Sequence, residues 1–434
     1  MTELVEVAKI LEGGMEAKQV RIRGWLHARR MGGGIQFLLL RDGSGIIQCT
    51  AKKDQVGDQT FGMLGEVPRE STLELSGIVQ RDTRSPGGFE ISLRGVKVLH
   101  RSTEQFPIAR KRHGPDFLLD HRHLWVRSEK MQKTMRVRAE MLEAARAWFK
   151  SQGYTEIQVP TLITAAVEGG STLFEVKYFD AKAYLTQSWQ LYAEAVISSL
   201  GKIFTVAPSF RAEKSRTRRH LTEYWHLEAE APWVDLEGIL KVQEELLSSM
   251  CWYLAQKMGD ELRWIGRDPK YLEQIAPPFP RLSYDKAIET LTEKGMDIQW
   301  GADLGWREER TLTLEFEKPF FLTHFPKGVK AFYHMPDPSR PEVTLSADLL
   351  APEGYGEITG GGQRIHDLDQ LLKRIDEEHL DYKAYEWYVD LRKYGTVPHS
   401  GFGMGVERTL SWICKLRHIR DAILFPRLIG RVYP

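Results

Sequence analysis

Two segments of the sequence carry side chains that could bind an anion. The stretch from Phe210 to Glu230 reads as two strands around a loop with several cationic side chains, among them Arg211 and Arg219. Because like charges repel, a phosphate chain or the end of a nucleic acid would explain such a loop. On its composition alone, the loop could equally be an exposed, solvated hairpin.

The second segment is rich in glycine and ends at an arginine. Residues 401–408, GFGMGVER, read as a strand that enters an amphipathic helix. Glycines let the backbone approach a ligand closely, and Arg408 at the helix start could hold a phosphate. The segment does not match a dinucleotide fingerprint, because the third glycine and the ribose-binding acid are absent.

Together with GYTEIQVPTLIT around Pro160, these segments resemble the three signature motifs of the class II aminoacyl-tRNA synthetases, in the expected order. FRAE followed by RHLTE is similar to the subgroup that handles aspartate, asparagine and lysine, and the resemblance covers essentially the whole chain. It implies an enzyme that activates an amino acid with ATP and transfers it to a tRNA. Catalysis of that reaction depends mainly on positioning and on stabilising charge at phosphate oxygens.

The resemblance implies two catalytic residues in the ATP site. Arg211 would bind the α-phosphate and the amino-acid carboxylate, and Arg408 would bind the γ-phosphate and lie over the adenine. The other residues expected at ATP are Glu213 at the adenine amino group, Arg219 and His220 at the outer phosphates, Tyr224 beneath the base, Glu357 and Gly405. Trp225 is the alternative stacking partner, and a core role for both aromatic residues also remains open.

Mg²⁺ is the expected metal, because it prefers hard oxygen ligands. Glu357 and Asp348, in ADLLAPEGYGE, match the metal-binding acids of the family. The spacing between them is slightly longer than in aspartate enzymes, which makes Asp348 the less secure ligand. Gly360 stands where related aspartate enzymes offer a serine hydroxyl. Without the resemblance, scattered carboxylates of this kind would be read as a solvated face.

The expected amino-acid site favours a neutral side chain. Aspartate enzymes neutralise their substrate with a lysine and an arginine; here Ala193 takes the lysine position in QSWQLYA, while Arg364 is retained in GGGQRIH. Arg364 can donate to an amide carbonyl, and Glu228 can accept from an amide NH₂ while repelling aspartate. The segment WYVDLRKYGTVPHSGFGMG also resembles the asparagine-specific members of the subgroup. L-Asparagine and tRNA(Asn) are therefore the implied substrates.

Three further residues are assigned to the amino-acid site by resemblance. Glu168, in VEGGSTLF, matches a mobile loop that closes over the substrate ammonium, with glycines beside it for freedom. Gln187 and Gln190 would line the same pocket. Trp189 stands where the family commonly has proline, a change that could reshape a wall of the site.

The elements that precede these motifs read as a small β domain. Five short strands with glycine turns between Val20 and Leu99 predict a closed barrel of the oligonucleotide-binding type, with a β-sandwich as the competing fold. The resemblance implies that this barrel binds the anticodon, because single-stranded RNA is read by stacking and by base-edge hydrogen bonds. The residues implied are Phe37 for stacking, Gln48 for the central uracil, and Arg23 and Arg29 nearby. An isolated strand phenylalanine is more often a core residue.

The domain organisation follows from these patterns. We expect an anticodon-binding barrel in residues 1–104, a hinge in 105–126 and an α+β catalytic domain in 127–434 with an antiparallel sheet flanked by helices. Helical spacing covers 130–152 and 236–258, KAFYHMP at 330–336 reads as a strand, and residues 259–300 read as an insertion without an assigned role. The basic hinge could contact a phosphate backbone or be a solvated linker.

The composition fits an enzyme of this kind. The 434 residues are 42% hydrophobic and 27% charged, with a net charge of +1, which suits a folded protein with local basic patches rather than a general nucleic-acid coat. The three cysteines predict free thiols, and neither a signal sequence nor an apolar run of membrane-spanning length is evident. We therefore expect a cytoplasmic protein without membrane association. A homodimer built around the helix before Pro160 is implied by resemblance only.

Three alternatives remain open at this point. The nearest is an aspartate enzyme, including one that charges the tRNAs of both aspartate and asparagine, although Ala193 argues against it. A tRNA-independent ligase of the same fold would lack the barrel with Phe37 and Gln48. A non-catalytic RNA-binding relative would not be expected to retain Arg211 and Arg408.

Overall fold

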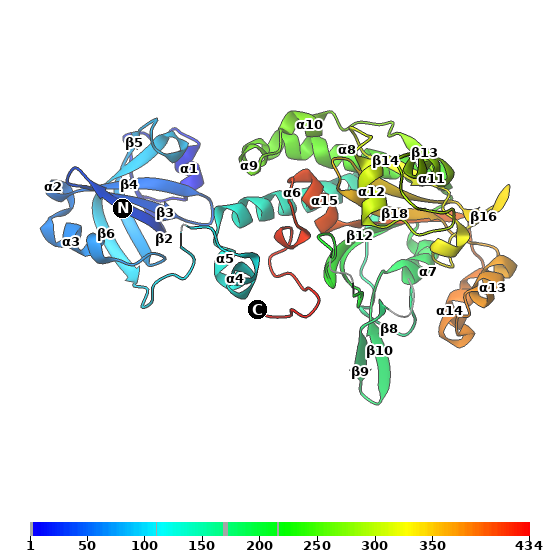
Figure 1. Ribbon diagram of the computed structural model, residues 1–434. Coiled ribbons are helices and arrows are strands. Elements are labelled where there is room, and N and C mark those ends of the chain that lie inside the picture. Colours follow the sequence, from blue (N-terminus) through cyan, green and yellow to red (C-terminus); the bar gives the residue numbers. More distant parts are fainter. Residues whose placement is uncertain (1–2, 110, 168–171, 215–216) are drawn as a thin grey trace. The chain divides into compact units, whose positions relative to one another are not determined.

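The computed structural model describes residues 3–109, 111–167, 172–214 and 217–434. The chain forms two compact units, Met1–Gly114 and Pro115–Pro434 (Figure 1). The segment expected to be a hinge, 105–126, is divided between them: its first part belongs to the first unit, and its helices α4 (Pro115–Asp120) and α5 (Arg122–Trp125) belong to the second.

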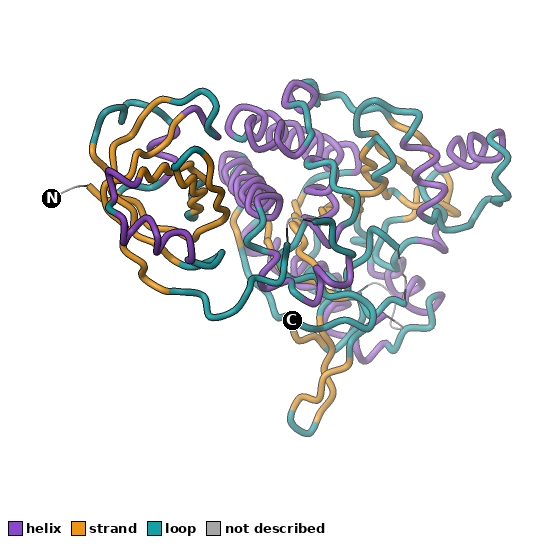
Figure 2. The backbone as a smooth tube through the Cα atoms, turned by 60° about the vertical axis from the view of Figure 1, so that its left-hand side comes forward, coloured by secondary structure: helices purple, strands orange, loops and turns teal. Residues whose placement is uncertain are grey.

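The first unit is a closed β-barrel. Its strands are β1 (Glu3–Leu4), β2 (Gln19–Gly32), β3 (Ile35–Arg41), β4 (Ile46–Lys52), β5 (Thr72–Arg81) and β6 (Phe89–His100), and its helices are α1 (Val7–Leu11), α2 (Lys53–Val56) and α3 (Asp58–Glu66). The strands are ordered β1-β2-β3-β4-β6-β5, and an additional pairing of β2 with β5 closes the ring (Figure 2). Alternating apolar residues such as Ile22, Leu38 and Leu75 fill the interior. The predicted barrel is confirmed, and the competing sandwich is not formed.

The second unit is built on an eight-stranded sheet in the order β13-β14-β17-β18-β19-β12-β11-β7. Its strands are β7 (Thr155–Glu156), β11 (Ile203–Phe210), β12 (Glu223–Pro232), β13 (Arg281–Ser283), β14 (Phe320–Thr323), β17 (Ser346–Ala351), β18 (Gly356–Gln363) and β19 (His399–Gly405). Only the pairings at the two edges, β13–β14 and β11–β7, are parallel. The predicted antiparallel sheet flanked by helices is confirmed.

Two long helices cover this sheet, at the places predicted from helical spacing. The first, α6 (Glu129–Ser151), begins at Ser128, whose hydroxyl caps the helix by accepting from the Met131 N–H. The second, α8 (Leu236–Lys257), begins at Asp235, whose carboxylate accepts from the Gly238 N–H. Their apolar faces share one core with the inner strands and with α15 (Val406–Ile413). Figure 1 shows the course of these helices beside the sheet.

The remaining elements lie around the sheet. The helices are α7 (Gln190–Leu200), α9 (Gly259–Ile265), α10 (Pro269–Glu273), α11 (Tyr284–Glu293), α12 (Trp306–Thr313), α13 (Leu368–Glu377) and α14 (Tyr382–Lys393). The short strands are β8 (Leu162–Ile163), β9 (Glu175–Tyr178), β10 (Ala181–Leu185), β15 (Pro336–Asp337) and β16 (Arg340–Thr344). The prediction of a strand for KAFYHMP is wrong. This segment forms turns that place Phe332, Tyr333 and Met335 in a separate core beside α13 and α14.

The basic hinge segment is tied into the second unit by one arginine. Arg122 is only 2% exposed and donates to the backbone carbonyls of Arg420, Ile423 and Leu424. This side chain therefore has a structural role rather than a phosphate contact. The cysteines are free and buried, as predicted. Across the described residues, none of the helices combines the length and apolar character needed to cross a membrane.

Candidate active site

The two anion-binding segments meet in the middle of the sheet. β11 and β12 pair as far as Phe210 opposite Glu223, so Arg211 leaves the sheet close to Tyr224. The guanidinium carbon of Arg211 lies 5.8 Å from the centroid of the Tyr224 ring, which meets the ring of His226 edge-on at 4.9 Å. On its other side β12 pairs with β19, with His226 opposite Gly405. The glycine-rich strand therefore delivers α15 and Arg408 to the same place.

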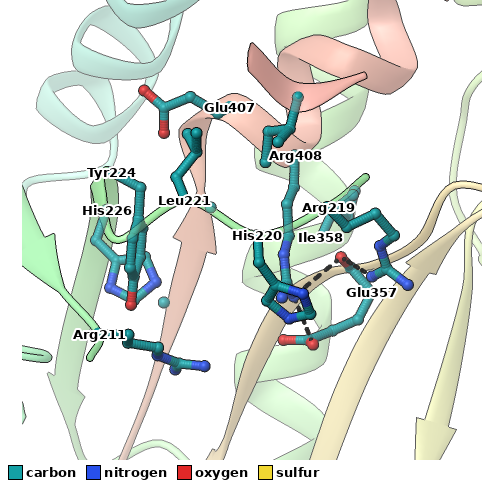
Figure 3. Close-up of a pocket in the computed structure, with 13 residues that line it drawn as sticks. Arg211, Arg219, His220, Leu221, Tyr224, His226, Glu357, Ile358, Glu407 and Arg408 are labelled. Carbon is teal, nitrogen blue, oxygen red and sulfur yellow. Dashed lines mark hydrogen bonds and ion pairs between the residues drawn. The ribbon is translucent and has the colours of Figure 1, made fainter. Parts of the chain in front are cut away.

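A pocket opens at this point (Figure 3). It is lined by seven of the eight residues expected to bind ATP: Arg211, Arg219, His220, Tyr224, Glu357, Gly405 and Arg408. The eighth, Glu213, is not among the lining residues. In Figure 3 the rings of Tyr224 and His226 lie on one side with Arg211 below them, and Arg219 and Arg408 lie beside Glu357 on the other. An aromatic wall beside several arginines suits a base that carries phosphates.

Glu357 is the acidic centre of this pocket. Its carboxylate Oε2 lies 2.6 Å from Nη1 of Arg408, and its backbone carbonyl accepts from Nη2 of Arg219 at 3.0 Å. Burial raises the pKa of the Glu357 carboxyl, but the surrounding cations, Arg408 first, outweigh burial and bring the pKa below its ordinary value. Glu357 is therefore ionised at neutral pH.

Two histidines of the pocket are held neutral. Burial, followed by the nearby charge of Arg408, lowers the pKa of His220 to about 4. Burial, followed by Arg211, lowers the pKa of His226 to about 3. Both rings can therefore exchange hydrogen bonds at neutral pH without adding positive charge to the site.

Asp348 lies across from Glu357 on the neighbouring strand. It pairs with Gly360, and a Cβ placed on Gly360 would be 3.2 Å from Asp348 Oδ1 and 3.5 Å from Glu357 Oε1. The two acids therefore face one small space with hard oxygen atoms, which fits a magnesium ion. Both Asp348 oxygens also lie 2.7 Å from Nζ of Lys330, so this ammonium already compensates one of the two acids. Among the described residues, no group of three His, Cys, Asp or Glu side chains has a metal-binding arrangement.

The expected amino-acid site is organised around Arg364. Its Nε and Nη2 face the carboxylate of Glu230 at 3.1 and 3.2 Å, and Nη2 also donates to Oε1 of Gln190 at 2.6 Å. Gln190 in turn donates to Glu194 at 2.8 Å, and Glu194 is held by Arg392, Tyr388 and His399. The orientation of Gln190 is thus fixed at both ends by charged partners.

A glycine of the third motif makes room for this arrangement. A Cβ on Gly401 would lie 1.8 Å from Glu230 Oε2, so a side chain there would displace the partner of Arg364. We expected this glycine-rich strand to let the backbone approach a ligand. At Gly401 it instead accommodates a carboxylate from the adjacent strand.

Other residues expected at the amino acid lie around the same strands. Glu228, two positions before Glu230 on β12, accepts from the Ser188 hydroxyl and from the Trp189 N–H at 3.2 Å. Gln187 is buried and donates to Thr172 at 2.6 Å. Ala193 is fully buried in an apolar cluster with Trp189, so no cation replaces the missing lysine at that position. Glu168 lies outside the described residues.

The barrel presents a polar surface on β3, β4 and β6. Phe37 lies on its outer face, and Gln48 donates to Glu90 at 2.9 Å and to Ser85 at 2.8 Å. The arginine beside Phe37 is Arg30, whose guanidinium carbon lies 4.4 Å from the ring centroid. A β-bulge between Leu26 and Ala28 causes this, because it shifts β2 by one residue against β3 and pairs Arg30 with Phe37.

The two arginines expected at this surface have other partners. Arg23 forms an ion pair with Glu74 on β5 at 2.6 Å. Arg29 donates to the backbone carbonyls of Leu64 and Val67, which ties α3 and the loop after it to the barrel. Arg30 and Glu90 are therefore the charged residues that sequence reasoning missed here. Alternation along β2 could not identify Arg30 without knowledge of the bulge.

Two titratable residues that line the main pocket, His226 and Glu407, were also missed. His226 lies beside Tyr224, and Glu407 receives Arg138 at 2.8 Å and the Trp225 N–H at 2.9 Å. Both were within the quoted motifs, at positions adjacent to residues that were selected. A titratable side chain beside a selected motif residue was the signal by which each could have been found.

Comparisons with known proteins agree with this architecture. Residues 114–429 match the family model of class II tRNA synthetases (D, K and N), and residues 20–99 match an OB-fold nucleic acid binding domain. An asparagine–tRNA ligase from Pyrococcus abyssi is 50% identical over 422 residues, 97% of each chain. The asparaginyl-tRNA synthetase from Pyrococcus horikoshii, solved with asparaginyl-adenylate, superimposes with a TM-score of 0.94 at 50% identity over 97% of both chains. An aspartyl-tRNA synthetase from Entamoeba histolytica matches with a TM-score of 0.85 at 28% identity, over 99% of this chain and 92% of that one.

The chain therefore belongs to the class II tRNA synthetases of the aspartate, lysine and asparagine group, which are ligases that form aminoacyl-tRNA. Within that group its similarity is greater to the asparagine–tRNA ligases than to the aspartate enzyme, since identity is 50% to the former and 28% to the latter.

Proposed function

We propose that this chain is an asparagine–tRNA ligase. It activates L-asparagine with ATP to form asparaginyl-adenylate, releases pyrophosphate and transfers the asparaginyl group to the 3′ end of tRNA(Asn). The observation that carries the choice of amino acid is the pairing of Arg364 with Glu230 in a site that lacks a second cation at Ala193. An aspartate carboxylate would meet an arginine, Arg364, that Glu230 already compensates, whereas an amide needs no counter-charge.

Arg364 still has a donor for this amide. Among the described contacts, Nε and Nη2 bond to Glu230 and Gln190, whereas no bond is made by Nη1. We assign Nη1 to the amide carbonyl of asparagine and Glu228 to its NH₂ group. Gln187, Gln190 and Glu168 complete the assigned amino-acid site, with Glu168 closing over the ammonium.

The ATP site is assigned to the main pocket. Arg211 holds the α-phosphate and the substrate carboxylate, and so brings the two reacting groups together. Tyr224 lies beneath the adenine, Glu213 reads its amino group, and Arg219 and His220 receive the outer phosphates. Arg408, beside Gly405, gives up its ion pair with Glu357 and binds the γ-phosphate. Developing charge on the phosphates is thus met by preorganised cations.

Magnesium is assigned to Glu357 and Asp348. The support is that their oxygens converge on the space above Gly360. When bound, the ion would neutralise charge on the phosphates of ATP. Glu357, which stays ionised, is the principal ligand in this assignment, and Asp348 is shared with Lys330.

The barrel is assigned to the anticodon, with Phe37 stacking on a base and Gln48 hydrogen-bonding to the central uracil. The support is that Phe37 is on the outer face and that both donors of Gln48 are directed by Ser85 and Glu90. Gln48 Oε1 is then oriented as an acceptor.

We further propose that the protein is cytoplasmic and forms a homodimer. Sedimentation velocity of the full chain would test the dimer.

ATP–pyrophosphate exchange tests the choice of amino acid. We expect Mg²⁺-dependent exchange with asparagine and at most trace exchange with aspartate, in the absence of tRNA. Exchange with aspartate alone would keep the class and overturn the substrate. No exchange with either amino acid would favour a non-catalytic relative.

A further inference from the structure

An acidic residue that does not itself line the ATP pocket contacts two residues that do, Arg219 and Glu357. Glu309 lies on α12, and its Oε2 accepts from Nη1 of Arg219 at 2.6 Å and from the backbone N–H of Glu357 at 2.7 Å. Nη2 of Arg219 in turn donates to the backbone carbonyl of Glu357 at 3.0 Å. Three separate parts of the chain therefore meet in a closed ring of hydrogen bonds at one end of the pocket.

The ion pair in this ring is largely withdrawn from solvent. The side chains of Arg219 and Glu309 are each 14% exposed. Charge-assisted hydrogen bonds at that depth are screened less by salt than surface pairs, and removing one partner leaves the other poorly compensated. Because Arg219 is bonded at both terminal nitrogens, its direction is set before any nucleotide arrives.

The backbone next to Glu357 leaves room for this pair. Gly356 has a φ of +76°, and a Cβ placed there would lie 2.2 Å from Glu309 Oε2 and 2.3 Å from Nη1 of Arg219. The space left by the missing side chain is thus filled by the ion pair. The absence of a side chain at Gly356 is therefore a second observation, besides the hydrogen bonds, that points to this contact.

Glu309 is also presented from a fixed element. Leu312, on the same helix, is fully buried in a core with Leu304, Phe320 and Leu350. This core joins α12 to strands β14 and β17 of the large sheet. A side chain that must hold another in place is most effective when its own backbone is held by packing.

We propose that Glu309 is a positioning residue for the triphosphate of ATP, acting through Arg219. It holds the guanidinium and the backbone of Glu357 in the arrangement that receives the outer phosphates. The inference rests on the proposed function and gives the long segment between β12 and β14 a part in the ATP site. Without the carboxylate, the nucleotide itself would have to order Arg219, and binding would weaken by the cost of that ordering.

The test is Glu309→Gln, which keeps the size of the side chain and its ability to accept from the Glu357 N–H but loses the ion pair. We expect the Kd of a non-hydrolysable ATP analogue, measured by titration calorimetry, and the KM for ATP in exchange to rise about tenfold. The KM for asparagine and the Tm should change little, which separates positioning from a general structural role. Glu308→Gln is the matched control, because Glu308 lies on the same helix but is directed at Gly305.

A double-mutant cycle identifies the partner. In an Arg219→Ala background, Glu309→Gln should no longer weaken ATP binding, because its effect passes through Arg219. An equal effect in both backgrounds, or no effect of Glu309→Gln in the parent, would overturn the inference. If Glu309→Gln folds poorly, Glu309→Asp replaces it, since the shorter side chain should also lose Arg219; parental affinity there would equally contradict the inference. Analogue binding is measured without asparagine, so it remains interpretable even if exchange fails and the proposed function is wrong.

Discussion

Glu230 presents both of its carboxylate oxygens to Arg364, at 3.1 Å from Nε and 3.2 Å from Nη2, and neither side chain is more than 3% exposed. The arginine expected to read the substrate side chain is thus neutralised by the protein before any substrate binds. It acts as an oriented hydrogen-bond donor more than as a free positive charge. The pairing of Arg364 with Glu230 thus links the central strands to the proposed preference for a substrate with a side-chain amide over one with a side-chain carboxylate.

Arg364→Lys should remove this orientation, because an ammonium cannot form the two parallel bonds of a guanidinium. We expect kcat/KM for asparagine to fall about a hundredfold or more in ATP–pyrophosphate exchange, the loss expected for a bidentate charged contact. The KM for ATP should remain close to the parental value. A parallel loss for both substrates would instead indicate damage to the whole site.

Glu228→Gln should weaken the discrimination against aspartate. The substitution removes the carboxylate proposed to repel aspartate. The amide oxygen can still accept from the Ser188 hydroxyl, whereas the Trp189 N–H, which bonds to the other carboxylate oxygen, loses its acceptor. We expect the ratio of kcat/KM for asparagine over aspartate to fall about tenfold, equal to about 1.4 kcal/mol. The ratio is obtained from exchange rates with each amino acid. An unchanged ratio would assign discrimination to other residues.

Phe37→Ala should affect only the step that uses tRNA. Loss of a base-stacking ring costs about 1–3 kcal/mol, so the KM for tRNA(Asn) should rise about tenfold or more. Exchange without tRNA serves as the internal control and should be unaffected, because Phe37 belongs to the barrel unit. Arg30→Ala, which removes the cation over the same ring, should give a smaller effect in the same direction. A Phe37→Ala protein with parental tRNA charging would reject the assigned surface.

Stability should fall in mild acid because of His226. Its pKa is lowered to about 3 in the folded chain by burial and then by Arg211, so the unfolded chain takes up the proton first as pH falls below about 6.5. The contribution of this residue is complete above pH 6.5 and decreases toward pH 3, by about 2 kcal/mol at pH 5. Urea unfolding of the parent and of His226→Asn at pH 7.5 and 5 measures it. The variant should lose less stability than the parent between these pH values, and an equal loss in both would contradict the assignment.

The parts of the site that lie within one motif could be predicted from the sequence. Arg211, Tyr224 and Arg408 were assigned to one site by their resemblance to family motifs, and the paired strands β11, β12 and β19 do bring them to the same pocket. Glu309 could not be predicted, since it reaches Arg219 from a segment with no recognised pattern, 90 positions away in sequence.

Arg30 illustrates a different limit. The alternation of side chains places Arg23 and Arg29 on one face of β2, and the bulge after Leu26 reverses that alternation. A bulge is a local backbone feature that a single sequence does not reveal. Arg23 and Arg29 bond to other parts of the barrel, and Phe37 and Gln48 lie on the adjacent strands β3 and β4; contact of these residues with RNA stays a prediction.

The identity of the adenylate formed by the chain tests the central claim most directly. The full chain is mixed with ATP, Mg²⁺ and equal concentrations of asparagine and aspartate, and the enzyme-bound product is identified by mass spectrometry. We expect asparaginyl-adenylate to be the dominant species, because Arg364 is already compensated by Glu230 and the proposed site places the carboxylate of Glu228 at the substrate side chain. Aspartyl-adenylate in equal or greater amount would contradict this account of the site.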